Sequence, residues 1–160
     1  MSKLYVNEVH SKTGSTKALE IDSSGRVTMD ALPSFFATST NTGYAALAQF
    51  DYFAGGDWWN DVRHNTGNHF TASTGTFTAP VNGVYFFSFG VLNDGALSMN
   101  IQMHKNGTAI LQPYEDAGRH ITFSCNIYLS ANDAIRMQTL VADSFRLGSN
   151  YTWFSGCLIG

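Results

Sequence analysis

The chain has 160 residues, which is enough for one domain and a short additional segment. Nine basic and twelve acidic side chains give a net charge of −3, which argues against a nucleic-acid-binding protein because such proteins carry a basic patch. Charged residues make up only 13% of the chain, about half the usual share. So little charge indicates that part of the surface is buried against further copies of the chain.

The first 32 residues differ from the rest because they hold many charged and few aromatic side chains. Alternating stretches at residues 4–9 and 18–22 predict short strands, and residues 23–25 predict a turn before residues 26–29. Strands this short cannot bury a core alone, so this segment needs a partner or threefold association. The alternative is a loose leader segment, because chain ends are often poorly ordered.

From Pro33 onward the hydrophobic pattern predicts strands only. The longest predicted strand, residues 83–92, alternates so that one face is apolar and the other is half apolar, which is typical of a strand covered on both sides. Further strands are predicted at residues 44–50, around Phe70 and Phe77, and at residues 97–103, 121–129, 134–141 and 151–159, with a hairpin turn at residues 105–108. About eight to ten short strands without helical periodicity predict a sandwich or jelly roll.

Spaced aromatic, Asn and Gly residues carry a resemblance to a known family. They are Trp59, Asn65, Phe70, Phe77, Gly83, Tyr85, Phe87 and Phe89, followed by Leu-Ser-Ala-Asn-Asp at residues 129–133 and Phe-Ser-Gly-Cys-Leu-Ile at residues 154–159. Over about residues 33–160 the chain closely resembles the globular head of complement C1q, in the TNF-like superfamily. Trp59 stands where the family usually has Phe. Asn132 replaces the Gly of the family motif L-x-x-G-D, and Asn tolerates the same left-handed conformation.

The resemblance implies an all-β jelly-roll β-sandwich of the C1q and TNF-like type that assembles as a homotrimer and binds partners without catalysis. Its bounds leave a head domain, residues 33–160, and an N-terminal segment, residues 1–32, which we expect to serve for attachment. It also implies an inner sheet with one face in the core and the other toward the threefold axis. By alternation, the trimer-interface side chains on that face are Phe86, Ser88, Thr122, Ser124, Asn126 and Tyr128.

Residues 18–28 resemble the N-terminal segments of bacteriophage tail-fibre and virion structural proteins. The first residues contain no hydrophobic signal region, and no apolar run is long enough to insert into a membrane. Cys125 and Cys157 lie in apolar strand patterns, which predicts buried free thiols. We therefore expect a virion protein that is made in the host cytoplasm and is held through its N-terminus by a virion or tail protein.

The expected function is that of a trimeric fibre tip or knob that binds a glycan or protein of the host cell surface. One alternative is a cap or decoration protein without a receptor role, and another is an enzyme such as a depolymerase. The sequence contains no nucleophile elbow, and His64 and His69 have no third ligand at metal spacing. Neither a catalytic site nor a metal site is therefore predicted, and no cofactor is required.

The family places both chain ends at the stalk, so tracing strands back from the C-terminus assigns residues 142–150, 113–119 and 93–96 to the far end. Their side chains with binding chemistry are Asp94, Tyr114, Glu115, Asp116, Asp143, Phe145 and Arg146. Exposed aromatic rings beside carboxylates suit sugars. The carboxylates also offer oxygen ligands for calcium, which some heads of the family hold at this end. The alternative is that they only keep the tip soluble.

Overall fold

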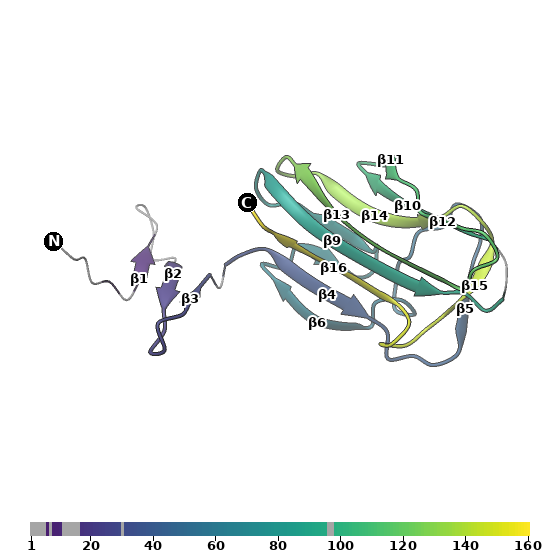
Figure 1. Cartoon of the computed structure of the whole chain (residues 1–160), viewed down its shortest axis with the longest axis horizontal. Coiled ribbons are helices and arrows are strands. Elements are labelled where there is room, and N and C mark those ends of the chain that lie inside the picture. Colours follow the sequence, from purple (N-terminus) through teal and green to yellow (C-terminus); the bar gives the residue numbers. More distant parts are fainter. Residues whose placement is uncertain (1–5, 7, 11–16, 30, 96–97) are drawn as a thin grey trace. The chain divides into compact units, whose positions relative to one another are not determined.

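The computed structural model describes residues 6, 8–10, 17–29, 31–95 and 98–160 of the chain. The chain forms two units, Met1–Leu32 and Pro33–Gly160. Sixteen strands and no α-helix occur in these described stretches (Figure 1). Within the same stretches there is no helix that has the length and hydropathy to cross a membrane.

The N-terminal unit is a three-stranded antiparallel sheet in the order β1-β2-β3. Its strands are β1 (Glu8–His10), β2 (Lys17–Ile21) and β3 (Val27–Thr28). The turn between β2 and β3 is closed by Asp22, whose Oδ1 accepts the backbone N–H groups of Ser24 (2.8 Å) and Arg26 (2.9 Å). The strands predicted at residues 18–22 and 26–29 are thus present. Part of the stretch predicted at residues 4–9 lies outside the described residues.

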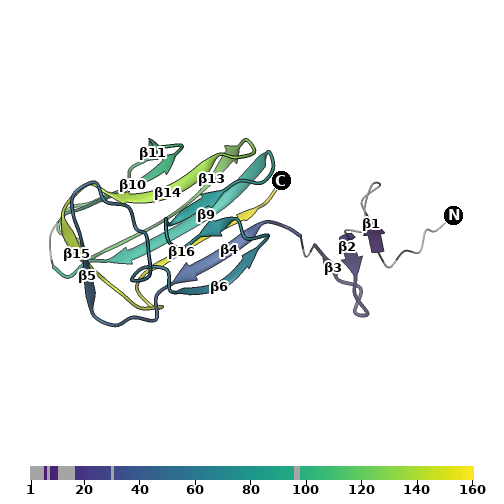
Figure 2. The same ribbon diagram turned by 180° about the vertical axis from the view of Figure 1, so that it is seen from behind.

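The head consists of two facing sheets and a small third one (Figures 1 and 2). The first sheet has the order β13-β9-β16-β4-β6, with bounds β4 (Ser34–Thr38), β6 (Asp61–Thr66), β9 (Gly83–Leu92), β13 (His120–Leu129) and β16 (Trp153–Leu158). The second has the order β11-β10-β14-β8-β7, with bounds β7 (Phe70–Thr71), β8 (Thr76–Thr78), β10 (Met99–Lys105), β11 (Thr108–Leu111) and β14 (Ala134–Thr139), and β12 (Tyr114–Glu115) also pairs with β10. The third joins β5 (Tyr44–Leu47) to β15 (Asp143–Arg146). This all-β jelly roll confirms the predicted fold class.

The core is aromatic because strand alternation aims rings into the space between the sheets. Along β9 the fully buried side chains are those of Tyr85, Phe87, Phe89 and Val91. Phe35 of β4 stacks on Phe70 of β7 with ring centroids 4.4 Å apart, which joins the two sheets. Each such ring contributes about 1.5–3 kcal/mol through burial.

The spaced residues of the sequence motif have local structural roles. The Asn65 side chain closes the turn from β6 to β7, since its amide donates to the Phe70 carbonyl (2.8 Å) and its carbonyl accepts the Phe70 N–H (3.0 Å). Trp59 is buried, and its indole N–H donates to the Phe53 carbonyl (2.8 Å). At Gly83 a Cβ would lie 2.8 Å from the Gly160 carbonyl oxygen, so a side chain there would strike the backbone. The spaced residues of the motif therefore mark turns and close backbone contacts as well as core positions.

Several strands differ from the sequence-based expectation. The strand expected at residues 44–50 ends at Leu47. β4 was not predicted, because Ser34–Thr38 has no solvent-exposed residue and its sequence therefore shows no alternation of polar and apolar side chains. Residues 142–150, expected as a loop, contain β15. Asn132 adopts a φ of 72°, in agreement with its expected left-handed conformation.

The carboxylate of Asp133 ties together the loops at one end of the head. Its oxygens accept hydrogen bonds from Lys105 Nζ (2.7 Å), Asn106 Nδ2 (2.6 Å) and the Ser130 N–H (2.8 Å). Chiefly because of the Lys105 bond, and then those of Asn106 and Ser130, the pKa of Asp133 falls to about 2. A depressed pKa means that the ionised carboxylate stabilises the folded state.

We predict that this contribution is complete above pH ~4, the ordinary pKa of an unfolded aspartate, and is lost as the pH falls toward 2. Urea unfolding at several pH values should show a smaller loss of stability between pH 4 and 2 for Asp133→Asn than for the unchanged protein. Identical acid dependence of the two proteins would contradict the role of this carboxylate.

Both cysteines are free thiols on opposite faces of the first sheet. Cys125 points to the core, with Sγ 3.8 Å from Met103 Sδ, and burial raises the pKa of its thiol. Cys157 pairs with Phe86 and shares the outer face of the sheet.

Alkylation of the native protein should therefore be slow at Cys125 and should accelerate above pH 9, because the thiolate is the reactive form. In denaturant, mass spectrometry should find both cysteines alkylated without any reductant. Labelling that requires prior reduction would reveal a disulfide and refute this prediction.

Candidate functional site

The small sheet of β5 and β15 forms one end of the head, which we call the tip (Figures 1 and 2). The first residues of β4 and the last residues of β16 lie at the other end, where Ser34 pairs with Cys157. Within β15, Asp143 stands opposite Leu47 and Arg146 opposite Tyr44. The polar residues predicted from residues 142–150 are thus held by a strand pair instead of a loop.

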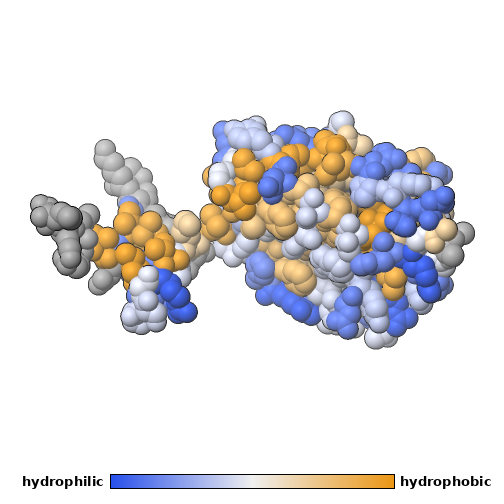
Figure 3. All heavy atoms as spheres, in the orientation of Figure 1, coloured by the Kyte–Doolittle hydropathy of each residue, from blue (hydrophilic) through white to orange (hydrophobic). Residues whose placement is uncertain are grey.

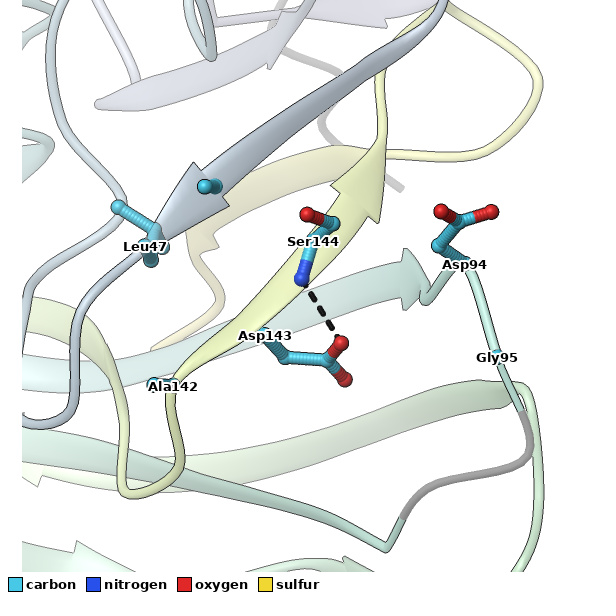
Figure 4. A pocket seen from close by; sticks show the side chains of 7 residues that line it. Leu47, Asp94, Gly95, Ala142, Asp143 and Ser144 are labelled. Atoms are coloured by element: carbon cyan, nitrogen blue, oxygen red, sulfur yellow. Dashed lines mark hydrogen bonds between the residues drawn. The ribbon is translucent and has the colours of Figure 1, made fainter.

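A hollow of about 490 Å³ opens beside this strand pair (Figure 4). Asp94, on the turn after β9, and Asp143 are its two carboxylates, and in Figure 4 they point in different directions. Asp143 accepts hydrogen bonds from the Ser144 N–H (2.7 Å) and from Asn93 Nδ2 (3.1 Å). The Asp94 N–H donates to the Ser144 carbonyl (2.8 Å), so the backbone fixes the turn against β15.

The other two predicted carboxylates belong to β12 and the turn after it. Glu115 is exposed, and Asp116 accepts a hydrogen bond from Ser98 Oγ (2.9 Å). Within the described residues no three acidic, histidine or cysteine side chains are grouped so that they could hold a metal ion. Among the described residues the four carboxylates are therefore not gathered into a calcium site, which the sequence had left open as a possibility.

The structure corrects the role predicted for Phe145. Its side chain is 0% exposed and packs against Phe53 and Trp58, with ring centroids 5.2 and 6.1 Å away. The prediction was wrong because alternation along β15 turns Phe145 into the core, where it cannot stack on a ligand. Tyr114, by contrast, is 57% exposed on β12.

Arg146 follows Phe145 and faces outward, where two tyrosines surround it. Its Cζ lies 5.1 Å from the ring centroid of Tyr44 and 5.2 Å from that of Tyr151, within the range of cation–π attraction. Both rings are partly exposed, at 41% and 38%. Sequence reasoning missed these two residues. Tyr44 begins β5, as the expected strand start at residue 44 has it, whereas Tyr151 lies in the turn before β16.

A second hollow, of about 310 Å³, lies next to Arg146. Its lining is otherwise neutral: Ser39, Thr40, Asn41, Thr42, Leu147, Gly148, Ser149, Asn150 and Tyr151. Hydroxyl and amide groups on the wall can each donate and accept hydrogen bonds. The tip thus presents two different surfaces, one acidic and one with a guanidinium group and aromatic rings.

The predicted trimer-interface residues share one surface, the outer face of the first sheet. The register pairs Ser88 with Ser124, Asn126 with Phe86, and Tyr128 with Val84, and all of these side chains point away from the core. Phe36 and Trp153 lie on the same face, and Trp153 covers Gly90, where a Cβ would come within 2.2 Å of the indole ring. Over β4, β9 and β16, Figure 3 shows orange and pale side chains in the middle and blue ones at the rim.

A hollow of about 260 Å³ marks the middle of this outer face. Phe36, Phe86, His64 and Cys157 lie around it. An apolar sheet face with a shallow depression suits a protein partner better than water.

Comparison with known proteins identifies the head. The model of the C1q domain matches residues 35–159. Complement C1q tumor necrosis factor-related protein 3 of Mus musculus is 35% identical over 69 residues, which are 41% of this chain and 28% of that protein. The collagen alpha-1(X) chain of Mus musculus is 27% identical over 108 residues, 63% of this chain and 16% of that protein. The chain thus spans less than a third of the length of these relatives.

Solved structures show the same fold at low sequence identity. The globular domain of zebrafish complement 1qA protein has a TM-score of 0.58 at 21% identity and covers 80% of this chain and 98% of its own. Eiger TNF from S. frugiperda has a TM-score of 0.66 at 11% identity, with coverage of 81% and 94%. Murine APRIL has a TM-score of 0.62 at 13% identity, with coverage of 80% and 99%.

Proposed function

Because the chain belongs to the C1q domain family, we propose that it is a homotrimeric recognition protein that binds a surface ligand without catalysing a reaction. Domains of the C1q and TNF-like type form homotrimers and serve as ligand-binding or structural modules. The fold of the head and its match to the family over residues 35–159 support the proposal.

The observation that carries the proposal is the apolar outer face of the first sheet. Phe36, Phe86 and Trp153 are only half-buried in the single chain, although they lie in the middle of a five-stranded sheet. Covering them with neighbouring copies removes apolar area from water. This burial stabilises the assembly by about 25 cal/mol per Å² of apolar area. The polar neighbours Ser88, Ser124 and Asn126 can then form hydrogen bonds between chains.

The setting that we propose is a bacteriophage virion, assembled from protein made in the host cytoplasm, with residues 1–32 as the attachment segment. The likeness of residues 18–28 to N-terminal segments of phage fibre proteins supports this setting. The relatives reported above are animal proteins, so they support the nature of the head and not its place on a virion.

In this arrangement the two ends of the head have different tasks. Pro33 continues from the attachment segment at one end, and the tip with Arg146 lies at the other. A ligand on the host surface, a glycan or a protein, then meets the tip. Three copies around one axis multiply a weak single-site affinity.

We predict that Phe86→Asp converts the trimer into monomers, because it brings three buried carboxylates close together without compensating positive charges. The matched control is Phe50→Asp. Phe50 is 59% exposed, its N–H donates to the Thr139 carbonyl of the second sheet, and its φ of 68° suits aspartate. Light scattering should give a trimeric mass for the control and the unchanged chain. A monomeric unchanged chain would disprove the trimer.

A second experiment separates attachment from recognition. A chain that begins at Pro33 should remain trimeric and adsorb to host cells, because the core and the tip lie wholly within residues 33–160. The same chain should be absent from purified virions. Its presence in virions would place the attachment surface on the head, and a trimer that does not adsorb to host cells would favour a cap or decoration protein.

A further inference from the structure

Arg146 differs from the other arginines in what its guanidinium contacts. Among the residues that the structure describes, it is the arginine whose side chain donates no hydrogen bond. The other four donate as follows: Arg26 to Asp22 (2.7 Å), Arg63 to Asp61 (3.0 Å), Arg119 to the Asp94 carbonyl (2.8 Å) and Arg136 to the Thr74 carbonyl (3.1 Å). The five N–H donors of Arg146 are therefore available to a ligand.

The two tyrosines beside Arg146 keep the guanidinium in place without occupying its donors. Tyr44 and Tyr151 attract it through their ring faces, at 5.1 and 5.2 Å. The Leu147 N–H donates to the Gly43 carbonyl (2.9 Å), and Thr152 Oγ1 donates to the Arg146 carbonyl, so the backbone on both sides of the arginine is also held. A guanidinium that is positioned in advance loses little freedom when it binds.

The hollow beside Arg146 contains no competing carboxylate in its lining. The exposed Asp57 is not part of this lining, and its Oδ1 accepts a hydrogen bond from Asn41 Nδ2 (3.3 Å). The acidic hollow with Asp94 and Asp143 lies toward the opposite end of the β5–β15 pair and would repel an anion. At about 310 Å³, the hollow beside Arg146 is at the lower end of the range of ~300–1,000 Å³ typical of small-ligand sites.

We propose that Arg146, Tyr44 and Tyr151 form a binding site for a sugar that bears an anionic group, a carboxylate or a sulfate. Such a ligand combines the two features that this site can recognise. The anionic group takes paired hydrogen bonds from the guanidinium, and the apolar faces of the sugar ring pack against tyrosine while its hydroxyls reach the neutral wall. The inference rests on the proposed function of the head as a recognition module and names the chemistry of its ligand.

The test uses the full chain and three probes with a common core: lactose, sialyl-lactose, which adds a carboxylate, and lactose sulfate. Binding is followed by NMR titration at low ionic strength, since salt screens an exposed ion pair. One or both anionic probes should bind at least about tenfold more tightly than lactose, the scale expected of charge-assisted hydrogen bonds. The comparison between the two identifies the anionic group that the site prefers.

Arg146→Gln should abolish the preference for the anionic probe, and Arg146→Lys should retain part of it because lysine keeps the charge but lacks the planar fork. Arg136→Gln is the matched control: Arg136 also lies over a tyrosine ring, that of Tyr52, with 3.6 Å between Cζ and the ring centroid, but on the second sheet. The control should bind like the unchanged chain. Light scattering of each variant verifies the trimer.

Equal binding of lactose and both anionic probes, no binding of any probe at millimolar concentration, or unchanged binding by Arg146→Gln would each overturn the site. Adsorption of the unchanged chain to host cells, measured in parallel, distinguishes a failure of the anionic-sugar site from a failure of the recognition function. A chain that adsorbs but fails these titrations refutes the anionic-sugar site alone. A trimer that fails to adsorb refutes the recognition function on which the site rests.

Discussion

The contact between Phe87 and the bare backbone of Gly156 sets the packing of the first sheet. A Cβ at Gly156 would lie 2.6 Å from Phe87 Cδ1 and 2.9 Å from Phe35 Cε1, so these two rings occupy the space that a side chain at position 156 would need. Phe154, two residues earlier on the same strand and face, then meets Phe35 edge to face at 4.9 Å. Since protein interiors are close-packed, this arrangement fixes where β4, β9 and β16 lie relative to one another.

The same alternation that builds this core also displays the two candidate binding surfaces. On β9, inward aromatic residues alternate with Phe86 and Ser88, which face outward toward the proposed partner chains. On β15, the buried ring of Phe145 anchors the strand, and Arg146 is carried to the opposite side. The residues of both candidate surfaces are therefore positioned by the packing of their immediate neighbours.

The sequence was a reliable guide where a period of two runs over many residues. The stretch at residues 83–92 became β9 and the one at residues 121–129 became most of β13, because each exposes one face to the core over its whole length. Short strands carry too few residues to show a period, so β15 was taken for a loop and Phe145 for an exposed ring. The pairing of Arg146 with Tyr44 joins distant parts of the chain through strand register, and a single sequence contains no signal for such a contact.

The antiparallel placement of β4 between β16 and β6 has a mechanical consequence. The chain enters the head at Pro33 and runs directly into β4, which is hydrogen-bonded along both edges. A pull between that entry point and the opposite end of the head acts along this strand and across its hydrogen bonds. Under such a load the hydrogen bonds on both edges of β4 are sheared together instead of opening one at a time.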